Sequence, residues 1–128
     1  MYDRLNFTFL YITHDEKIGR CISILKRTAR TYSEPLDELI AIPDDVKKVH
    51  FKVSVDKDYY QYFYSFDDGQ NFKKIGPKFK TAELSDDFIF RNCPGRGFFT
   101  GAFVGLACID LVSEHLNADF DYFEYIEK

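Results

Sequence analysis

Alternation of apolar and polar residues dominates the chain, and it has the period of two that is typical of β-strands. Its clearest form is residues 49–56, which read Val-His-Phe-Lys-Val-Ser-Val-Asp. Residues 118–125 alternate aromatic side chains with carboxylates and read Ala-Asp-Phe-Asp-Tyr-Phe-Glu-Tyr. Each run predicts a strand with one buried face and one face in water.

Aromatic and β-branched runs between turn signals predict further strands in the first half of the chain. Residues 7–13 and 18–26 form a hairpin that is interrupted by the polar residues 14–17, and a short strand is expected around residues 39–42. A turn at Lys57-Asp58 leads into a strand over 59–66 that is apolar on both faces. Asp67-Asp68-Gly69 is a strong turn signal and precedes a strand over 72–75.

The last third of the chain contains little that a helix would tolerate. Residues 84–88 predict one helical turn with Ser85 as its cap. Three glycines then fall within residues 97–105, and glycine inside a helix costs about 1 kcal/mol. We therefore expect strands over 101–110 and 118–126, with Phe103 and Phe120 in the core. Seven to nine strands with almost no helix predict an all-β, antiparallel two-sheet sandwich that forms a single domain over residues 1–128.

Composition narrows the class of protein. Aromatic residues make up 18% of the chain, with 14 Phe and 9 Tyr, and such residues favour half-buried sheet surfaces. A net charge of −4 argues against a nucleic-acid partner, and no apolar run is long enough to span a membrane. Three cysteines and an N-terminus without the profile of a secretion signal predict reduced thiols and a cytoplasmic location.

The residues also carry a resemblance to a known family. The run Gly-Phe-Phe-Thr-Gly-Ala-Phe-Val-Gly at 97–105 is its most specific part, supported by the segments 118–125, 49–56, 58–61, 64–67 and 75–77. Together they resemble, from about Phe7 to Glu127, the C-terminal β-sandwich of family 43 glycoside hydrolases of the β-xylosidase type. The resemblance implies a jelly-roll-like, concanavalin-A-like fold. Because the family's sandwich has strands before the one that resembles residues 7–13, we expect an N-terminally truncated version of it.

By this resemblance the chain is an accessory domain and not an enzyme on its own. Its implied role is to stabilise and cap a separate or missing β-propeller catalytic domain, whose own carboxylates hydrolyse xylo-oligosaccharides during xylan degradation. Asp119 and Asp121 lie two apart on one predicted strand face, but no sugar pocket is recognisable around them. We therefore interpret them as solvated or hydrogen-bonded acids and not as a catalytic pair.

Four residues are the candidate site residues. The resemblance implies that Phe98 and Phe99 lie on a loop that reaches towards the propeller and walls off the substrate pocket, the alternative being that both rings pack in the core. Residues 92–96 depart from the family pattern just before that loop. The resemblance also implies a structural calcium with Asp119 or Asp121 as a ligand, because calcium binds carboxylate and carbonyl oxygens. No other cofactor is expected.

Two other functions stay open from the sequence. A stand-alone carbohydrate-binding, lectin-like module would stack glycan on Tyr60, Tyr62 and Tyr64, which would then face solvent, whereas their burial favours the scaffold. A remnant of a disrupted gene is the third interpretation. Truncation would also leave the strand at residues 7–13 with an open, apolar edge, so we expect a homo-oligomer with this strand at or near the contact.

Overall fold

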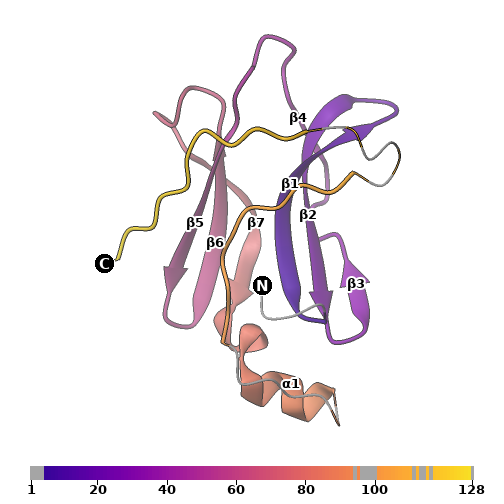
Figure 1. Ribbon diagram of the computed structural model, residues 1–128, viewed down its shortest axis with the longest axis vertical. Coiled ribbons are helices and arrows are strands. Elements are labelled where there is room, and N and C mark those ends of the chain that lie inside the picture. Colours follow the sequence, from indigo (N-terminus) through magenta and orange to yellow (C-terminus); the bar gives the residue numbers. More distant parts are fainter. Residues whose placement is uncertain are drawn as a thin grey trace.

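The computed structural model describes residues 5–93, 95, 101–110, 112, 115 and 117–127. Two antiparallel sheets make up most of it and face one another (Figure 1). The first sheet contains β1 (Phe7–Asp15), β2 (Gly19–Thr28), β3 (Thr31–Ser33) and β4 (Ile40–Ala41). The second contains β5 (His50–Asp56), β6 (Tyr59–Ser65) and β7 (Lys73–Lys80), in that order. This arrangement confirms the predicted all-β sandwich.

β1 and β2 form the predicted hairpin, in a register that pairs Phe7 with Arg27 at one end and Asp15 with Gly19 at the other. The turn is closed by Oδ1 of Asp15, which accepts hydrogen bonds from the backbone N–H groups of Lys17 and Ile18. Gly19 follows with φ +77°, a conformation that costs glycine little. β4 pairs with β2 at Cys21 and Ile22, which confirms the short strand expected around residues 39–42.

The Asp67-Asp68-Gly69 signal does form the turn between β6 and β7. Asp67 accepts from the hydroxyl of Ser65 at 2.5 Å and from the backbone and side-chain amides of Asn71 at 2.9 and 2.7 Å. These hydrogen bonds, the one from Ser65 first, lower the pKa of Asp67 to about 2. Beyond the turn β7 is longer than the sequence predicted, because it continues through Gly76 and Pro77 to Lys80. Pro77 is tolerated because β7 is an outer strand of its sheet.

The core lies between the two sheets. β2 contributes the fully buried Ile22 and Ile24, and the second sheet covers them with buried side chains of β6 and β7, namely Tyr60, Tyr64, Ile75 and Phe79. Gly76 brings β7 close to β2, since a Cβ atom at this position would lie 2.7 Å from Cδ1 of Ile24. Large side chains of β2, β6 and β7 therefore fill the space between the sheets, and the absence of a side chain at Gly76 lets β7 approach β2 closely.

A short helical region closes one end of the sandwich. It consists of a 3₁₀ turn, η1 (Thr81–Leu84), and α1 (Asp86–Asn92), with Ser85 capping α1 by accepting from the backbone N–H of Phe88. This confirms the predicted cap at Ser85. α1 buries Ile89 against Leu5 and Ala29. None of the described helices is long and apolar enough to cross a membrane.

The C-terminal third departs from the prediction. Residues 101–110 and 117–127 are assigned to no strand, although their alternation is typical of one. In Figure 1 these segments cross from one sheet to the other and back, ending beyond β5. The predicted core positions are also wrong, because Phe103 is 59% and Phe120 50% exposed. A strand pattern forms a strand only when a partner edge supplies a ladder of backbone hydrogen bonds, and within the described residues these segments take part in no strand pairing.

Candidate functional site

The row of tyrosines on β6 belongs to the core. Tyr60 is only 5% and Tyr64 only 8% exposed, and Tyr62 packs beside them against Phe79. The hydroxyl of Tyr60 lies 2.7 Å from that of Thr8, and the Tyr62 hydroxyl donates to the Thr8 carbonyl oxygen at 3.1 Å. Burial raises the pKa of Tyr60 and of Tyr62 above the ordinary tyrosine value. Because these rings are buried, they are not available to stack on a glycan, and the scaffold interpretation is favoured over the glycan-binding one.

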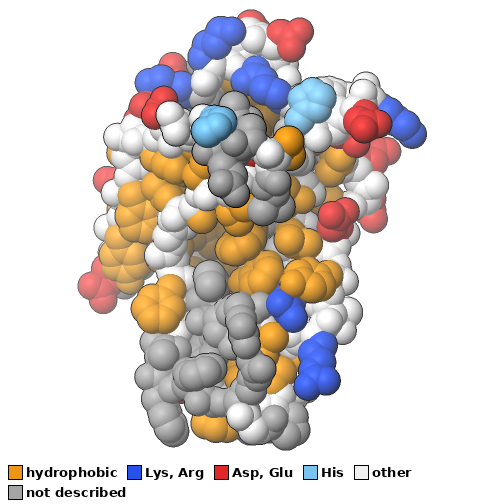
Figure 2. Space-filling model, turned by 45° about the vertical axis from the view of Figure 1, so that its right-hand side comes forward, with side chains coloured by type: hydrophobic (Ala, Val, Ile, Leu, Met, Phe, Trp, Pro, Cys, Tyr) orange, Lys and Arg blue, Asp and Glu red, His pale blue; other side chains and the backbone are white. Residues whose placement is uncertain are grey.

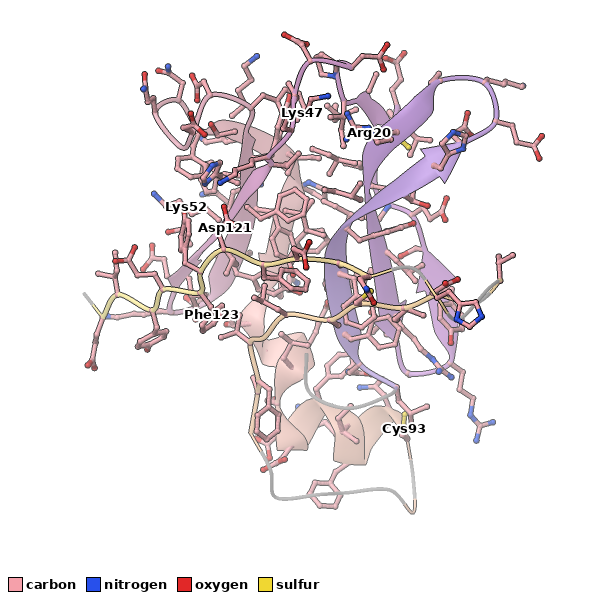
Figure 3. The ribbon with its side chains drawn as sticks, turned by 45° about the horizontal axis from the view of Figure 1, so that its top comes forward. Arg20, Lys47, Lys52, Cys93, Asp121 and Phe123 are labelled. Atoms are coloured by element: carbon pink, nitrogen blue, oxygen red, sulfur yellow. The ribbon has the colours of Figure 1, made fainter. Side chains whose placement is uncertain are left out.

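Asp121 is engaged by a lysine from another part of the chain. Its Oδ2 lies 2.5 Å from Nζ of Lys48, which stands just before β5, and both side chains are more than half exposed. The hydrogen bond from Lys48 and its charge lower the pKa of Asp121, and the same contact raises the pKa of Lys48. Asp121 therefore anchors the C-terminal segment to the second sheet, as Figure 3 shows where this segment passes β5.

The calcium hypothesis finds no carboxylate cluster. Asp119 is exposed, Asp121 is paired with Lys48, and no group of three or more His, Cys, Asp or Glu side chains suited to a metal ion occurs within the described residues. Calcium takes six to eight oxygen ligands, so two carboxylates do not make a site. The structural calcium at Asp119 or Asp121 stays a prediction.

His50 is a second anchor of the C-terminal segment, and no pattern in the sequence indicates this role. Its Nδ1 lies 2.9 Å from the hydroxyl of Tyr122, and its Nε2 lies 3.7 Å from Oδ1 of Asp68. In the sequence His50 is one polar position in an alternating run, and Tyr122 is one aromatic position in another. Because 72 residues separate them, no spacing rule brings them together.

An exposed apolar surface extends over the two C-terminal segments, and we call it the terminal apolar surface. Its members are large hydrophobic side chains that remain at least half exposed: Phe103, Val104, Leu106, Ile109, Phe120, Tyr122, Phe123, Tyr125 and Ile126. Figure 2 shows hydrophobic side chains spread across the middle of one face of the molecule, with charged groups gathered at its upper end. Large exposed apolar patches are typical of interaction sites, so this surface is a candidate docking site.

The two phenylalanines that the resemblance assigns to pocket capping, Phe98 and Phe99, lie outside the described residues. The glycines on either side of this segment are described, and Gly95 and Gly101 have φ +79° and +70°. Both conformations belong to the left-handed region that favours glycine. Each side of the predicted capping loop therefore has a glycine in a conformation that other residues rarely adopt.

The two facing antiparallel sheets are consistent with a concanavalin-A-like sandwich. A family model described as "Beta xylosidase C-terminal Concanavalin A-like domain" matches residues 1–126, and the chain belongs to this family. The resemblance seen in the sequence is thereby confirmed.

Several proteins are similar to this chain over nearly its whole length. A "Beta-xylosidase" of Bacillus subtilis (strain 168) is 44% identical over 127 residues, which are 99% of this chain and 23% of the relative. A "Putative beta-xylosidase" of Escherichia coli (strain K12) is 39% identical over 97% of this chain and 22% of the relative. The chain thus spans less than a quarter of the curated relatives that it matches.

A solved structure agrees with the fold. The crystal structure of xylan beta-1,4-xylosidase from Bacillus halodurans C-125 superposes with a TM-score of 0.64 and 23% identity, covering 69% of this chain and 17% of that protein. At this identity the likeness shows the shared fold alone.

Proposed function

We propose that this chain is an accessory domain that stabilises a β-propeller catalytic domain and caps its active site during the hydrolysis of xylo-oligosaccharides. The observation that carries the proposal is the match over residues 1–126 to the C-terminal domain family, together with the small share of each relative that the chain spans. Catalysis then belongs to the part of such proteins that this chain does not match.

The terminal apolar surface supports this role. A face that carries Phe103, Phe120 and Phe123 half exposed is costly in water and gains stability when another domain covers it. The second of its two segments, residues 117–127, is also acidic. It contains Asp119, Asp121, Glu124 and Glu127 and no lysine or arginine. A partner surface with an apolar centre and basic groups around it would fit. We propose that the propeller supplies it and that Phe98 and Phe99 reach its substrate pocket.

Reconstitution tests this function. The Bacillus subtilis relative, shortened by the residues that this chain matches, is mixed with the chain, and association, thermal midpoint and β-xyloside hydrolysis are measured. We expect a complex with a higher midpoint and higher activity than the shortened relative has alone. Replacing Phe120 and Phe123 by Asp should abolish association, whereas Lys78→Asp on β7 is a charge-changing control that should not. A shortened relative that is neither bound nor stabilised would refute the proposal.

A separate variant tests the capping residues. Phe98→Ala and Phe99→Ala should leave association intact and weaken substrate binding, because an aromatic wall of the pocket is removed while the docking surface is kept. If both variants bind and stimulate the shortened relative as the unmodified chain does, the capping role is wrong and the stabilising role survives.

We also propose that the isolated chain self-associates in a cytoplasmic setting. Within the described residues β1 pairs only with β2, so its outer edge carries backbone groups without a neighbouring strand. Such edges pair with other chains unless they are covered. Sedimentation equilibrium should show a dimer or larger assembly. A strict monomer, with the amides of Phe7 to Thr13 protected from exchange, would show that the fold covers this edge itself.

A further inference from the structure

An open pocket lies at the end of the sandwich where two loops meet. One loop joins β4 to β5 and the other joins β6 to β7. The pocket has a volume of about 320 Å³ and is lined by Asp45, Val46, Lys47, Lys48, Phe66 and Asp68. This volume is at the lower end of the roughly 300–1,000 Å³ typical of small-molecule sites, which suits a ligand of one or two rings.

Hydrogen bonds hold both loops in place. The guanidinium of Arg20 on β2 donates to the carbonyl oxygens of Pro43 and Val46, at 3.4 and 3.0 Å, and so fixes the first loop to β2. Figure 3 shows Arg20 and Lys47 at this same end of the molecule. The second loop is fixed by Asp67 and its bonds from Ser65 and Asn71. A site with fixed walls loses little conformational entropy when a ligand binds.

The lining combines charges of both signs with apolar atoms. Asp45 and Asp68 supply carboxylates, and Lys47 supplies an ammonium group that lies 3.3 Å from the Asp44 carbonyl oxygen. The ammonium group of Lys48 is already paired with Asp121. Because carboxylates lie beside the lysines, an anion would gain little electrostatic stabilisation here. The charge of Lys48 is already compensated by Asp121. The lining therefore favours a neutral ligand that both donates and accepts hydrogen bonds.

Beside the pocket, one buried polar atom lacks a partner. Nε2 of His50 is inaccessible to solvent and makes no hydrogen bond with the described residues. It lies 3.7 Å from Oδ1 of Asp68, which lines the pocket, and this separation is too long for a direct hydrogen bond. The Asp68 side chain is 84% exposed, so a ligand hydroxyl can donate to its carboxylate, whereas Nε2 of His50 is enclosed and would not contact the ligand.

We propose that this pocket binds one unit of a neutral sugar, with its hydroxyl groups on Asp45, Lys47 and Asp68 and its apolar face against Phe66. One aromatic ring and several charged side chains in the same lining match the C–H face and the hydroxyl edge of a pyranose. The lining includes neither the predicted capping residues Phe98 and Phe99 nor the buried tyrosines of β6. Through this site the accessory domain would bind substrate or product sugar without help from the propeller.

Backbone NMR of the full chain, without any propeller, tests the site. The amide signals are followed during titration with xylose and xylobiose to tens of millimolar, with inorganic phosphate and acetate as charged comparisons. We expect saturable shifts confined to the amides of residues 45–48 and 66–71. Larger shifts with phosphate than with xylose would overturn the neutral-sugar assignment. Shifts confined to the terminal apolar surface, or none that saturate, would overturn the site.

Three variants of the lining and one control variant locate the contacts. Asp45→Ala and Lys47→Ala should each weaken the sugar affinity by about tenfold, since each removes a charged hydrogen-bonding group. Lys78→Ala, an exposed lysine on β7, should leave the affinity unchanged. Phe66→Leu keeps an apolar side chain in a position that packs on Tyr64 but removes the ring, so it should weaken binding while the thermal midpoint changes little. Equal affinity in all four variants would refute the assignment.

Discussion

Gly76 on β7 faces Ile24 on β2 so closely that a Cβ atom on the glycine would lie 2.7 Å from Cδ1 of the isoleucine. The backbone of Gly76 also has φ +67°, which favours glycine. Two requirements for glycine therefore coincide at one residue, a close contact with the opposite sheet and a left-handed backbone conformation.

Gly76→Ala should reduce the free energy of unfolding by about 2–4 kcal/mol, because an overpacked core and a left-handed backbone at a non-glycine residue both cost energy. Urea denaturation followed by far-ultraviolet circular dichroism measures it. Gly19→Ala is the matched control, since Gly19 has φ +77° but nothing within 4 Å of the added carbon. It should cost about 1 kcal/mol. Equal losses in the two variants would show that the contact with Ile24 is unimportant.

Asn6 should be the most sensitive polar residue of the fold. It is 1% exposed, donates to the Glu83 carbonyl oxygen at 2.6 Å and accepts from the Ala29 backbone N–H at 2.7 Å. Asn6→Leu keeps the volume but leaves both backbone groups without this partner, so we expect a loss of about 2–4 kcal/mol. Asn92→Leu, at an exposed position on α1, is the control and should cost far less. A variant of Asn6 with an unchanged denaturation midpoint would contradict this expectation.

The turn at Asp67 should make the stability of the fold depend on pH in the acid range. Hydrogen bonds from Ser65 and Asn71 lower the pKa of this carboxyl from 3.8 to about 2. A lowered pKa in the folded state means that the stabilisation is present above pH 3.8 and is lost as the pH falls towards about 2. Thermal midpoints across this range should fall more steeply for the unmodified chain than for Asp67→Asn. Parallel curves for the two proteins would show that Asp67 is not the group responsible.

The pair of Lys48 and Asp121 should hold the C-terminal segment at neutral pH and release it in acid. Because the pKa of Asp121 is lowered by Lys48, its contribution is present above the ordinary pKa of aspartate and is lost as the pH falls through the lowered value. Both groups are exposed, so added salt should weaken the pair too.

Heteronuclear NOE values of residues 117–127 measure this release. They should fall in Lys48→Met, in acid and in high salt. Lys52→Met, a neighbouring lysine on β5 without an ion pair among the described residues, should leave them unchanged. If Lys48→Met also leaves them unchanged, the segment is held by its other contacts.

The isolated chain should not hydrolyse p-nitrophenyl β-xyloside. Asp119 and Asp121 stand on an exposed segment, and Asp121 is a partner of Lys48 and not of a second carboxylate. A glycosidase needs an acid and a base on opposite sides of an enclosed sugar. Turnover that disappears in Asp119→Asn or Asp121→Asn would overturn this expectation, whereas turnover that both variants retain would indicate a contaminating enzyme.

Several local elements of this protein can be predicted from the order of its residues. Alternation at residues 49–56 and the signals at Asp67 to Gly69 and at Ser85 lead to β5, to the turn after β6 and to the start of α1. These features depend on neighbours in the chain, because side-chain period, turn conformation and capping are set within a few residues. The specific run at residues 97–105 also sufficed to indicate the family.

The pairing of the strand-like segments and the burial of their faces depend on contacts between distant parts of the chain, and they become visible only in the folded structure. Tyr60 and Phe120 lie in similar aromatic runs, yet Tyr60 is buried and Phe120 is half exposed. His50 meets Tyr122 across 72 residues, and Gly76 is required by Ile24 on the opposite sheet. Burial depends on what packs against a residue, and alternation describes only the strand that carries it. The partner strand and the opposing sheet come from distant parts of the chain, and a local sequence pattern does not specify which parts these are.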